Sequence, residues 1–350
     1  MIKLVDLAER GWIPDSLLRI GMRRLLLKRL QQDQSNATES GKSNFVDQMV
    51  ASPLAVATTD ANHQHYEVPT EVFQNMLGPH LKYSCAFYED GDASLAEAEL
   101  AMLKMTAERA QLRSAQRVLE LGCGWGSLTL FMAEEYPDSD ITAVSNSHSQ
   151  RLYIEAQAAQ RGLPNITVIT MDMNNFAPVG KFDRVVSIEM FEHMRNYKVL
   201  FNRISHWLSA DGLLFFHIFC HRDQPYFFAD DSEEDWMARN FFTGGLMPSL
   251  DLPKKFEGEL RQQRCWVVNG QHYARTCAAW LRNLDKNRTE ILKILDVSEN
   301  PYPAQILWQR WRMFVMACEE MFVYEGGETW MVGHFLFEKV DDEKSAAGKE

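Results

Sequence analysis

The stretch Arg117-Val118-Leu119-Glu120-Leu121-Gly122-Cys123-Gly124-Trp125-Gly126 decides the fold of this chain. Its first five residues form a short, mostly apolar segment of the kind found in buried strands, and glycines then occupy every second position. The run from Ser127 to Glu135 that follows has helical character. Glycines in such a turn let the backbone approach a ligand closely, and the first N–H groups of the next helix can bind it. The sequence therefore predicts a ligand site between this strand and this helix.

The chain around this unit alternates between strand-like and helix-like segments. The predicted strands are 140–145, 166–171, 182–188 and 213–219, and the predicted helices are 93–113, 150–160 and 197–208. Such alternation indicates an α/β fold with a parallel, doubly wound sheet that binds ligands at the carboxyl ends of its strands. Two later segments, 265–269 and 329–337, resemble closing strands, with helical stretches between them.

Four parts of the chain are expected to have different tasks. They are an N-terminal helical segment that completes the ligand site (1–92), a Rossmann-like binding core (93–220), a substrate-binding insertion with the closing strands (221–340) and a charged, disordered tail (341–350). The insertion is rich in aromatic residues and is expected to form a cap. Residues 1–30 predict an amphipathic helix that either packs on the body of the protein or lies on a membrane surface. The polar stretch 31–43 predicts a flexible connector.

The composition argues against several classes of protein. The chain has 350 residues and a formal net charge of −12. Because an acidic surface repels phosphate backbones, nucleic acid is not expected as a partner. No apolar run approaches the roughly 18 residues that a membrane span requires, so no transmembrane segment is predicted. The 6 cysteines include no C-x-x-C pair, which argues against a metal site and favours reduced thiols in the cytoplasm.

The glycine-rich turn indicates which cofactor it holds. Glu120 lies two residues before the first glycine, and the G-x-G-x-G spacing resembles the methyltransferase motif more than the dinucleotide-binding one. The sequence therefore predicts a Rossmann-like fold of the class I methyltransferase type with S-adenosylmethionine as cofactor. Asp172, Met173 and Asn174, at the end of the third strand, are expected near the adenine.

The end of the second strand departs from the usual nucleotide site. A carboxylate is expected there to hold the ribose hydroxyls, but the chain has Val144-Ser145-Asn146-Ser147. Either hydroxyl and amide groups such as Ser145, Asn146 and Gln150 hold the ribose, or the cofactor assignment is wrong.

Three titratable side chains follow the fourth strand in Ser187-Ile188-Glu189-Met190-Phe191-Glu192-His193-Met194. Methyl transfer to nitrogen needs a lone pair, so an ammonium substrate must first give its proton to a positioned carboxylate or imidazole. Glu192 and His193 fit this task, with Glu189 close by. The alternative is a structural hydrogen-bond cluster at the start of a helix.

Several long motifs give the chain a resemblance to a known family. They are H-Y-E-V-P-T-E-V-F (65–73), L-G-P-H-L-K-Y-S-C-A-F-Y (77–88), E-L-G-C-G-W-G (120–126), S-I-E-M-F-E-H-M-R-N-Y (187–197), D-W-M-A-R-N-F-F-T-G-G-L-M-P-S (235–249) and W-V-V-N-G-Q-H-Y-A-R-T-C-A-A-W (266–280). From about 62 to 339 the chain resembles the cyclopropane fatty acid synthase family. Within it, the likeness is greatest to the coclaurine N-methyltransferase type, which methylates benzylisoquinoline alkaloids.

The resemblance implies roles for individual residues. Tyr83 and Ser84 are expected to close over the cofactor, with Gly122 and Gly124 beneath it, and Ser145, Asn146 and Gln150 to replace the ribose carboxylate. The full predicted cofactor set is Tyr83, Ser84, Glu120, Gly122, Gly124, Ser145, Asn146, Gln150, Asp172, Met173, Asn174 and Ile188. In the alkaloid branch the Glu and His of the E-x-x-E-H motif carry deprotonation, which matches Glu192 and His193.

The resemblance leaves the substrate open. In lipid-modifying members a bicarbonate acts as the base, held at positions that match Cys85, Glu192, His217 and Tyr273, and all four residue types are present. The first hypothesis is an N-methyltransferase for a small-molecule aromatic amine, with a homodimer as its candidate assembly. The second is a cyclopropane synthase or related lipid methyltransferase that uses bicarbonate. The third is a degenerate methyltransferase fold without activity.

Overall fold

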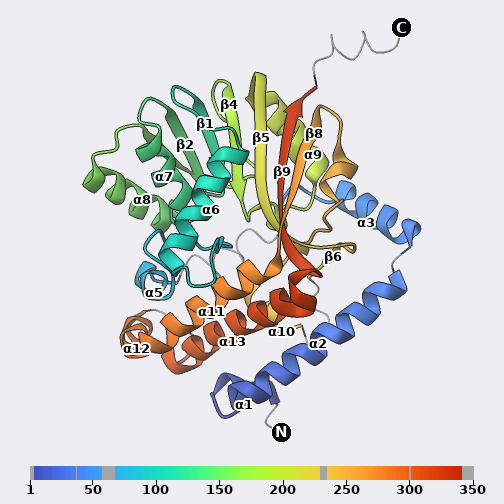
Figure 1. The fold of residues 1–350 in the computed structure, drawn as a ribbon, viewed down its shortest axis with the longest axis vertical. Coiled ribbons are helices and arrows are strands. Elements are labelled where there is room, and N and C mark those ends of the chain that lie inside the picture. Colours follow the sequence, from blue (N-terminus) through green and yellow to red (C-terminus); the bar gives the residue numbers. More distant parts are fainter. Residues whose placement is uncertain (1–3, 37, 57–67, 229–234, 299–300, 341–350) are drawn as a thin grey trace.

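The computed structural model describes residues 4–36, 38–56, 68–228, 235–298 and 301–340 (Figure 1). The α-helices are α1 (Leu4–Glu9), α2 (Asp15–Asn36), α3 (Glu39–Ala51), α5 (Thr70–Met76), α6 (Leu95–Arg109), α7 (Ser127–Glu135), α8 (His148–Arg161), α9 (Tyr197–Trp207), α10 (Trp236–Phe241), α11 (Gly270–Lys286), α12 (Arg288–Val297) and α13 (Ala304–Val323). The strands are β1 (Arg117–Leu121), β2 (Asp140–Ser145), β3 (Ile166–Thr170), β4 (Phe182–Ile188), β5 (Leu208–His221), β6 (Tyr226–Phe227), β7 (Leu246–Met247), β8 (Leu260–Val268) and β9 (Trp330–Lys339). Short 3-10 turns are η1 (Phe191–His193), η2 (Pro253–Phe256) and η3 (Tyr324–Gly327).

A seven-stranded sheet forms the centre of the molecule, in the order β3-β2-β1-β4-β5-β9-β8. The strands from β3 to β5 pair in parallel, whereas β9 pairs antiparallel with both β5 and β8. The chain order reverses direction between β1 and β4, and ligands bind at such a switch point in doubly wound sheets. The predicted Rossmann-like, doubly wound fold and its closing strands are therefore confirmed.

Aromatic stacking packs β5 against the turn η1 and strand β9. Phe216 lies between Phe191 and Phe335, with ring centroids 4.4 Å and 5.0 Å away. All three side chains are fully buried. Replacing a buried Phe by Ala costs about 3–5 kcal/mol, so this stack anchors the end of β4 and the turn η1 to the sheet.

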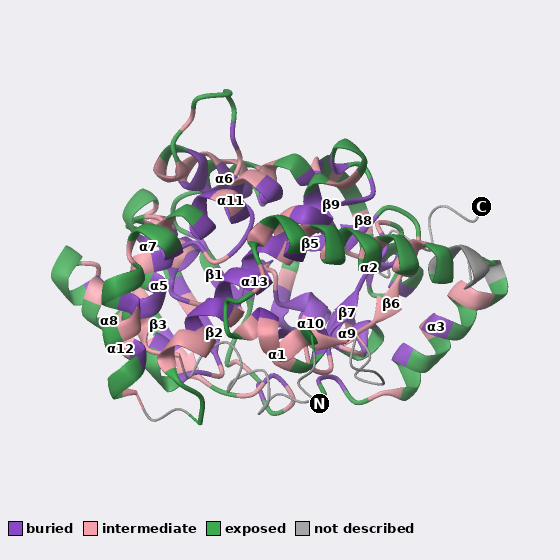
Figure 2. Ribbon diagram, turned by 90° about the horizontal axis from the view of Figure 1, so that it is seen from below, coloured by how far each residue is buried: buried purple, intermediate pink, exposed green. Residues whose placement is uncertain are grey.

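A helical layer covers the carboxyl ends of the parallel strands (Figure 1). It consists of α5, α11, α12 and α13, which pack on one another, and α2 runs along the outside of α13. Figure 2 shows that buried residues concentrate in the strands, whereas α3 and α8 turn exposed sides outward. The glycine turn after β1 therefore opens into the space between the sheet and this layer.

The N-terminal segment differs from the expectation in two places. The prediction of a flexible connector at 31–43 is wrong, because α2 continues to Asn36 and α3 begins at Glu39. Ion pairs from Arg19 and Arg23 to Glu320 of α13 hold α2 to the body. Thr38 caps α3, since its side chain accepts a hydrogen bond from the Gly41 N–H. The predicted single helix at 1–30 is instead α1 and the first part of α2.

Two further expectations concern the ends of the chain and membranes. The predicted disordered tail, 341–350, lies outside the described residues. Within the described ranges, no helix combines the length and the apolar character that crossing a membrane requires.

Candidate functional site

The turn after β1 leaves room for a ligand at one glycine and is tightly packed at another. Gly122 and Gly124 both have positive φ, at 76° and 51°, a region in which side chains other than glycine are strained. A Cβ added at Gly122 would lie 2.7 Å from the Cβ of Met190, whereas one added at Gly124 would meet nothing within 4 Å. Gly122 thus lets the end of β4 approach, and the space above Gly124 is open.

Two cavities adjoin at this turn and share part of their lining. The main cavity is lined by the turn, the loop at 81–84, Glu189 and His193, and residues of α11 and α13. The side cavity is lined by Val56, Val144, Ser145, Asn146, Met171, Met173, Met190 and Met194. Gly122, Gly124, Gln150, Glu189 and His193 line both. The arrangement can therefore hold one extended ligand that crosses the turn and still leave room for a second molecule in the main cavity.

The lining of the main cavity at this turn offers donors that lack acceptors. The side-chain nitrogens of Gln150 and Trp125 and the hydroxyl of Ser127 are buried and have no hydrogen-bond partner among the described residues. The Gln150 carbonyl already accepts a hydrogen bond from the Ser145 hydroxyl at 2.5 Å, so its amide nitrogen remains for a ligand. Buried polar groups are nearly always paired, which makes these donors a fit for the polar atoms of S-adenosylmethionine.

Glu120 also lines this end of the main cavity. Its carboxylate accepts a hydrogen bond from the Thr129 hydroxyl at 2.5 Å. Burial raises the pKa of Glu120 to about 8, with Thr129 opposing the shift. The group is therefore mostly neutral near pH 7, and a positive charge on a ligand would favour its ionised form.

Most of the predicted cofactor residues come together here, but two do not. Tyr83, Ser84, Glu120 and Ile188 line the main cavity, and the remaining ones line the side cavity or both: Gly122, Gly124, Ser145, Asn146, Gln150 and Met173. Asp172 and Asn174 line neither. The Asn174 side chain instead accepts from the N–H of Ala55 at 3.2 Å, and Asp172 accepts from the Asn174 N–H at 2.7 Å.

The carboxylate of Glu189 is the centre of the hydrogen-bond network at the end of β4. One oxygen accepts from the backbone N–H of Cys85 at 3.0 Å and faces Nε2 of His217 at 3.0 Å. The other accepts from the Tyr273 hydroxyl at 2.5 Å. These partners come from the loop before α6, from β5 and from α11, so three distant segments hold one carboxylate.

Glu189 is also held in a strained conformation. Its φ is +49°, and the left-handed region costs a residue with a side chain roughly 1–2 kcal/mol. Such strain is typical of functional sites in which surrounding contacts fix the residue. Burial raises the pKa of Glu189, while Lys82 and the Tyr273 hydroxyl oppose the shift.

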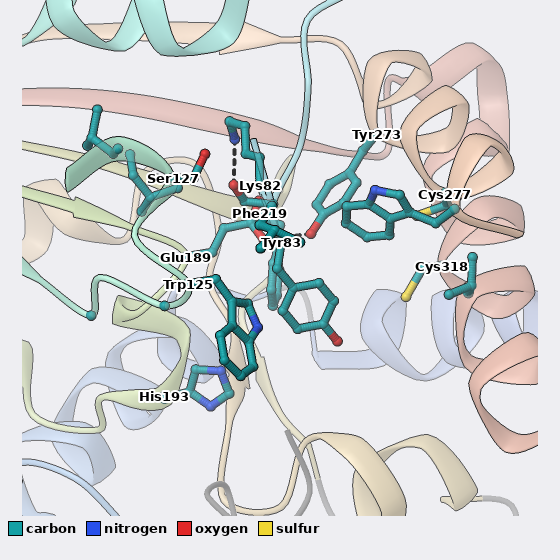
Figure 3. Close-up of a pocket in the computed structure, with 18 of the residues that line it drawn as sticks. Lys82, Tyr83, Trp125, Ser127, Glu189, His193, Phe219, Tyr273, Cys277 and Cys318 are labelled. Atoms are coloured by element: carbon teal, nitrogen blue, oxygen red, sulfur yellow. Dashed lines mark hydrogen bonds between the residues drawn. The ribbon is translucent and has the colours of Figure 1, made fainter. Parts of the chain in front are cut away.

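Lys82 is the main site residue for which the sequence analysis predicted no role. It is 3% exposed, lines the main cavity, and donates to the Ser84 hydroxyl and the Cys85 carbonyl. Figure 3 shows Lys82, Tyr83, Glu189 and Tyr273 gathered in the middle of the cavity. Its position inside the block at 77–88, directly before Tyr83 and Ser84, was the available signal. Its ammonium group favours the ionised form of the Glu189 carboxyl.

Glu192 and His193 face different surroundings although they are adjacent. Glu192 is 0% exposed and lines neither cavity, and one of its oxygens accepts from the Phe219 N–H at 2.8 Å. Burial and the charge of Glu189 raise the pKa of Glu192 well above its usual range. His193 lines both cavities, and burial lowers its pKa to about 4. The two shifts thus favour the uncharged form of both side chains.

An aromatic wall closes the far side of the main cavity. It consists of Phe219, Phe228, Phe242, Tyr273, Trp280, Phe314 and Phe322. The rings of Phe242 and His193 are nearly parallel, with centroids 5.7 Å apart. Six of these seven residues belong to the aromatic-rich insertion that the sequence predicts at 221–340. Trp308 and Trp311 of the same insertion belong to the buried core instead. The wall can hold a flat, apolar ring, and its carboxylate neighbour can hold a cation.

The chain matches a family model and shows full-length similarity to plant enzymes. The family model for mycolic acid cyclopropane synthetase matches residues 56–330. An (S)-coclaurine N-methyltransferase from Thalictrum flavum subsp. glaucum is 35% identical over 97% of this chain and 96% of the relative. A cyclopropane-fatty-acyl-phospholipid synthase from Escherichia coli (strain K12) is 31% identical over 62% of this chain and 54% of the relative.

A solved structure is also similar to this protein over nearly its whole length. A crystal structure of coclaurine N-methyltransferase bound to N-methylheliamine and SAH superposes with a TM-score of 0.92 and 35% identity. The match covers 96% of this chain and 99% of the other. The sheet topology and the match to this structure both support the class I methyltransferase fold that the sequence predicts.

Proposed function

Because this chain belongs to the mycolic acid cyclopropane synthetase family, we propose that it is an S-adenosylmethionine-dependent N-methyltransferase of a small aromatic amine of the benzylisoquinoline type. Its similarity to coclaurine N-methyltransferases extends over nearly the whole length of both chains. The observation that carries the proposal is one cavity that joins the glycine turn, the Glu189 carboxylate and an aromatic wall.

The cofactor end is suited to S-adenosylmethionine. Bound there, this cofactor supplies an electrophilic methyl group on a positively charged sulfur. The backbone of Gly122 and Gly124, the buried amide of Gln150 and the hydroxyl of Ser127 would hold it. The open space above Gly124 and the donors without acceptors support this assignment.

The amine end provides two kinds of contact. The wall of Phe242, Phe314 and Phe322 offers aromatic surface for a flat ring, and Glu189 provides negative charge for an ammonium. A substrate that carries both features would place its nitrogen between the wall and the turn. Excluding water strengthens the attraction between ammonium and carboxylate, because the local dielectric is low.

Deprotonation of the amine is assigned to Glu189 with help from His193. An ammonium lacks the lone pair that attacks the methyl carbon, so its proton must move to a base first. Glu189 lines the cavity and its raised pKa brings it closer to that of a useful base. His193 is neutral and can accept a hydrogen bond from the substrate nitrogen. Glu192 is less suited to this step, since its carboxyl accepts from the Phe219 N–H and lines neither cavity.

The lipid hypothesis is the less supported alternative. It requires a bicarbonate at the positions of Cys85, Glu192, His217 and Tyr273. Three of these residues already direct a donor to Glu189, so the Glu189 carboxylate stands where an anion would be held. A built-in carboxylate makes a separate base unnecessary for amine chemistry.

The test is a substrate comparison with one preparation of the enzyme. We expect N-methylated product, detected by mass spectrometry, from at least one member of a panel of benzylisoquinolines and phenylalkylamines. In parallel, the chain is expressed in a bacterium that lacks its own cyclopropane synthase, and fatty acids are analysed for ring formation. Ring-bearing fatty acids without any methylated amine would overturn the proposal and favour the lipid alternative. No product in either arm, with an intact fold, would favour a degenerate methyltransferase.

A further inference from the structure

We propose that Arg109 and His334 are positioning residues for this reaction, acting through His217 to hold Glu189 as an ionised hydrogen-bond acceptor. Neither residue lines the main cavity, and neither was singled out by the sequence motifs. The inference rests on the proposed function of Glu189, but the chain of contacts can be tested without any turnover.

Three hydrogen bonds connect the outer face of the sheet to Glu189. Nη1 of Arg109, in α6, lies 2.8 Å from Nδ1 of His334, in β9. Nε2 of His334 lies 2.9 Å from Nδ1 of His217, in β5. Nε2 of His217 lies 3.0 Å from Oε1 of Glu189. His217 and His334 face each other across the β5–β9 pair and are both 0% exposed.

When both imidazoles are neutral, the donors in this series of hydrogen bonds can point in only one direction. An arginine can donate hydrogen bonds but cannot accept them, so Nδ1 of His334 must be the acceptor. The proton of His334 then lies on Nε2 and is donated to Nδ1 of His217. The proton of His217 consequently lies on Nε2 and points to Glu189. Each N–H that takes part in these three hydrogen bonds thus points inward, toward the Glu189 carboxylate.

Burial keeps both imidazoles in this neutral form. It is the largest cause that lowers the pKa of His217 and of His334 well below the usual value, and the positive charge of Arg109 lowers both further. The Arg109 guanidinium lies over the ring of Trp266, 5.2 Å from its centroid. A fixed cation therefore stands at the outer end of the chain and the carboxylate at its inner end, and hydrogen bonds in such a network polarise one another.

The direction of the chain also determines where the substrate proton goes. A proton taken up by Glu189 cannot pass outward, because the chain ends on a guanidinium that has no site to accept it. The proton must leave through the cavity, with product release. This series of hydrogen bonds therefore orients Glu189 and favours its ionised form, and it does not conduct protons to the surface.

Other groups also act on Glu189 and must be held constant in a test. They are Lys82 and Cys85 from the loop before α6, Glu192 and His193 from η1, and Tyr273 from α11. The hydrogen bonds of Arg109 and His334 in this network join them to each other and to His217, and include none of these groups. Variants at the outer end of the chain therefore leave the immediate partners of Glu189 other than His217 in place.

The first experiment compares two amide variants of His334 with the wild type. In His334→Gln, the longer amide can still donate to Nδ1 of His217, whereas in His334→Asn it is too short. We expect the Asn variant to lose about 10–100-fold in kcat/KM at pH 7, the range usual for residues that orient metal-binding histidines through a hydrogen bond. Its acid limb should move up by about one pH unit, because Glu189 is more easily protonated. The Gln variant should recover most of both effects.

A second pair of variants tests the guanidinium. Arg109→Met should shift the acid limb in the same direction and Arg109→Lys, which keeps a donor, should restore it in part. Arg264→Met is the matched control, since Arg264 lines the same surface pocket as Arg109 but does not take part in the hydrogen bonds that lead to Glu189. An unshifted acid limb in both Arg109→Met and His334→Asn would overturn the proposal, as would equal impairment of His334→Gln and His334→Asn.

Nitrogen NMR of histidine-labelled protein separates this proposal from the function. We expect His217 and His334 both to carry their proton on Nε2 in the wild type, with assignments made from the variants. His217 should lose that preference in His334→Asn while thermal unfolding and S-adenosylhomocysteine binding stay near wild type. A proton on Nδ1 of either residue in the wild type would refute the chain, even if the enzyme methylates amines. Failure of every amine substrate with the expected tautomers would instead refute the proposed function alone.

Discussion

The two ends of the main cavity are built in opposite ways. Most of the polar groups at the cofactor end come from two short stretches, the turn at 120–127 and the segment at 145–150, and Tyr83, Ser84 and Met173 add to them. At the chemical end, Glu189 takes its partners from residues 104, 28 and 84 positions away in the chain. The cofactor end is therefore largely local in the sequence, whereas the chemical end depends on tertiary packing.

The two ends also differ in how complete they are. Donors at the cofactor end, such as the Gln150 amide, have no partner among the described residues. The Glu189 carboxylate already receives three hydrogen bonds. Preorganised groups of this kind act on the transition state without reorganising. Changes at the first end should thus alter cofactor affinity, and changes at the second should alter turnover.

The largest expected effect is that of Glu189→Gln. An amide cannot take up the substrate proton, and it would place an N–H donor against the donors of His217, Tyr273 or Cys85. We expect kcat to fall by about 10³-fold, within the range usual for loss of a general base. The dissociation constant of S-adenosylhomocysteine should change by less than about threefold, in keeping with the separate roles of the two ends. Steady-state kinetics and calorimetry measure the two quantities.

Glu135→Gln, an exposed change at the end of α7, serves as the control for loss of one negative charge. If Glu189→Gln weakened cofactor binding as strongly as it reduced turnover, the division of the cavity into two ends would be wrong.

Gly124→Ala should produce the next largest effect, and at the other end. Its Cβ would meet no protein atom within 4 Å, so it would project into the space assigned to the cofactor. We expect a loss of roughly 10–100-fold in S-adenosylhomocysteine affinity, equivalent to about 1.4–2.8 kcal/mol. The melting temperature should fall only slightly, because the left-handed φ costs an alanine about 1–2 kcal/mol.

Gly122→Ala provides the contrast, since its Cβ would overlap Met190 and should destabilise the protein itself. Unchanged affinity in Gly124→Ala would show that the ligand does not cross the turn there.

The contrast explains which features could be predicted from the sequence. Strands β1 to β5 were predicted because apolar strands, turns and helices follow one another at a regular spacing. That order placed the glycine turn, Ser145 and Gln150 at one edge of the sheet, since the carboxyl ends of parallel strands meet there, and the family resemblance implied the role of Ser145 and Gln150 at the ribose. Asp172 and Asn174 stand at the same edge but form a turn and hold Ala55. Their side-chain directions depend on a neighbouring segment that no local pattern describes.

The chemical end was predicted only in part, for a related reason. The motif named Glu189, Glu192 and His193, but their spacing does not tell which carboxylate reaches the cavity. The strained backbone of Glu189 turns it toward Tyr273, whereas Glu192 lies against the backbone of β5. Lys82 is one position within the block at 77–88 and His334 lies outside every motif, so their contacts could be recognised only once β5, β9 and the loop before α6 come together.

A smaller effect is expected from pH at the cofactor end. Glu120 has a pKa of about 8 in the free protein, and the ammonium of S-adenosylhomocysteine should lower it. Affinity should therefore rise with pH up to about 8 and then level off, by at most roughly tenfold between pH 7 and 8. Binding near pH 7 should release a proton, which calorimetry in buffers of different ionisation enthalpy detects. Glu120→Gln should remove this slope, and a flat profile in the wild type would contradict the assignment.

Glu192→Gln should have the smallest effect, although Glu192 belongs to the motif. Burial and the charge of Glu189 raise the pKa of its carboxyl, which favours the protonated form, and an amide has nearly the shape of a protonated carboxyl. The amide oxygen can still accept from the Phe219 N–H, which the native side chain does at 2.8 Å. We therefore expect kcat within about threefold of wild type, against the roughly 10³-fold loss in Glu189→Gln. Glu192→Ala is the informative companion, because it removes that acceptor, leaves a cavity behind η1 and should lower the melting temperature. If Glu192→Gln lost activity as fully as Glu189→Gln, proton transfer would require both carboxyls, and the chemical end would extend into the buried layer behind the cavity.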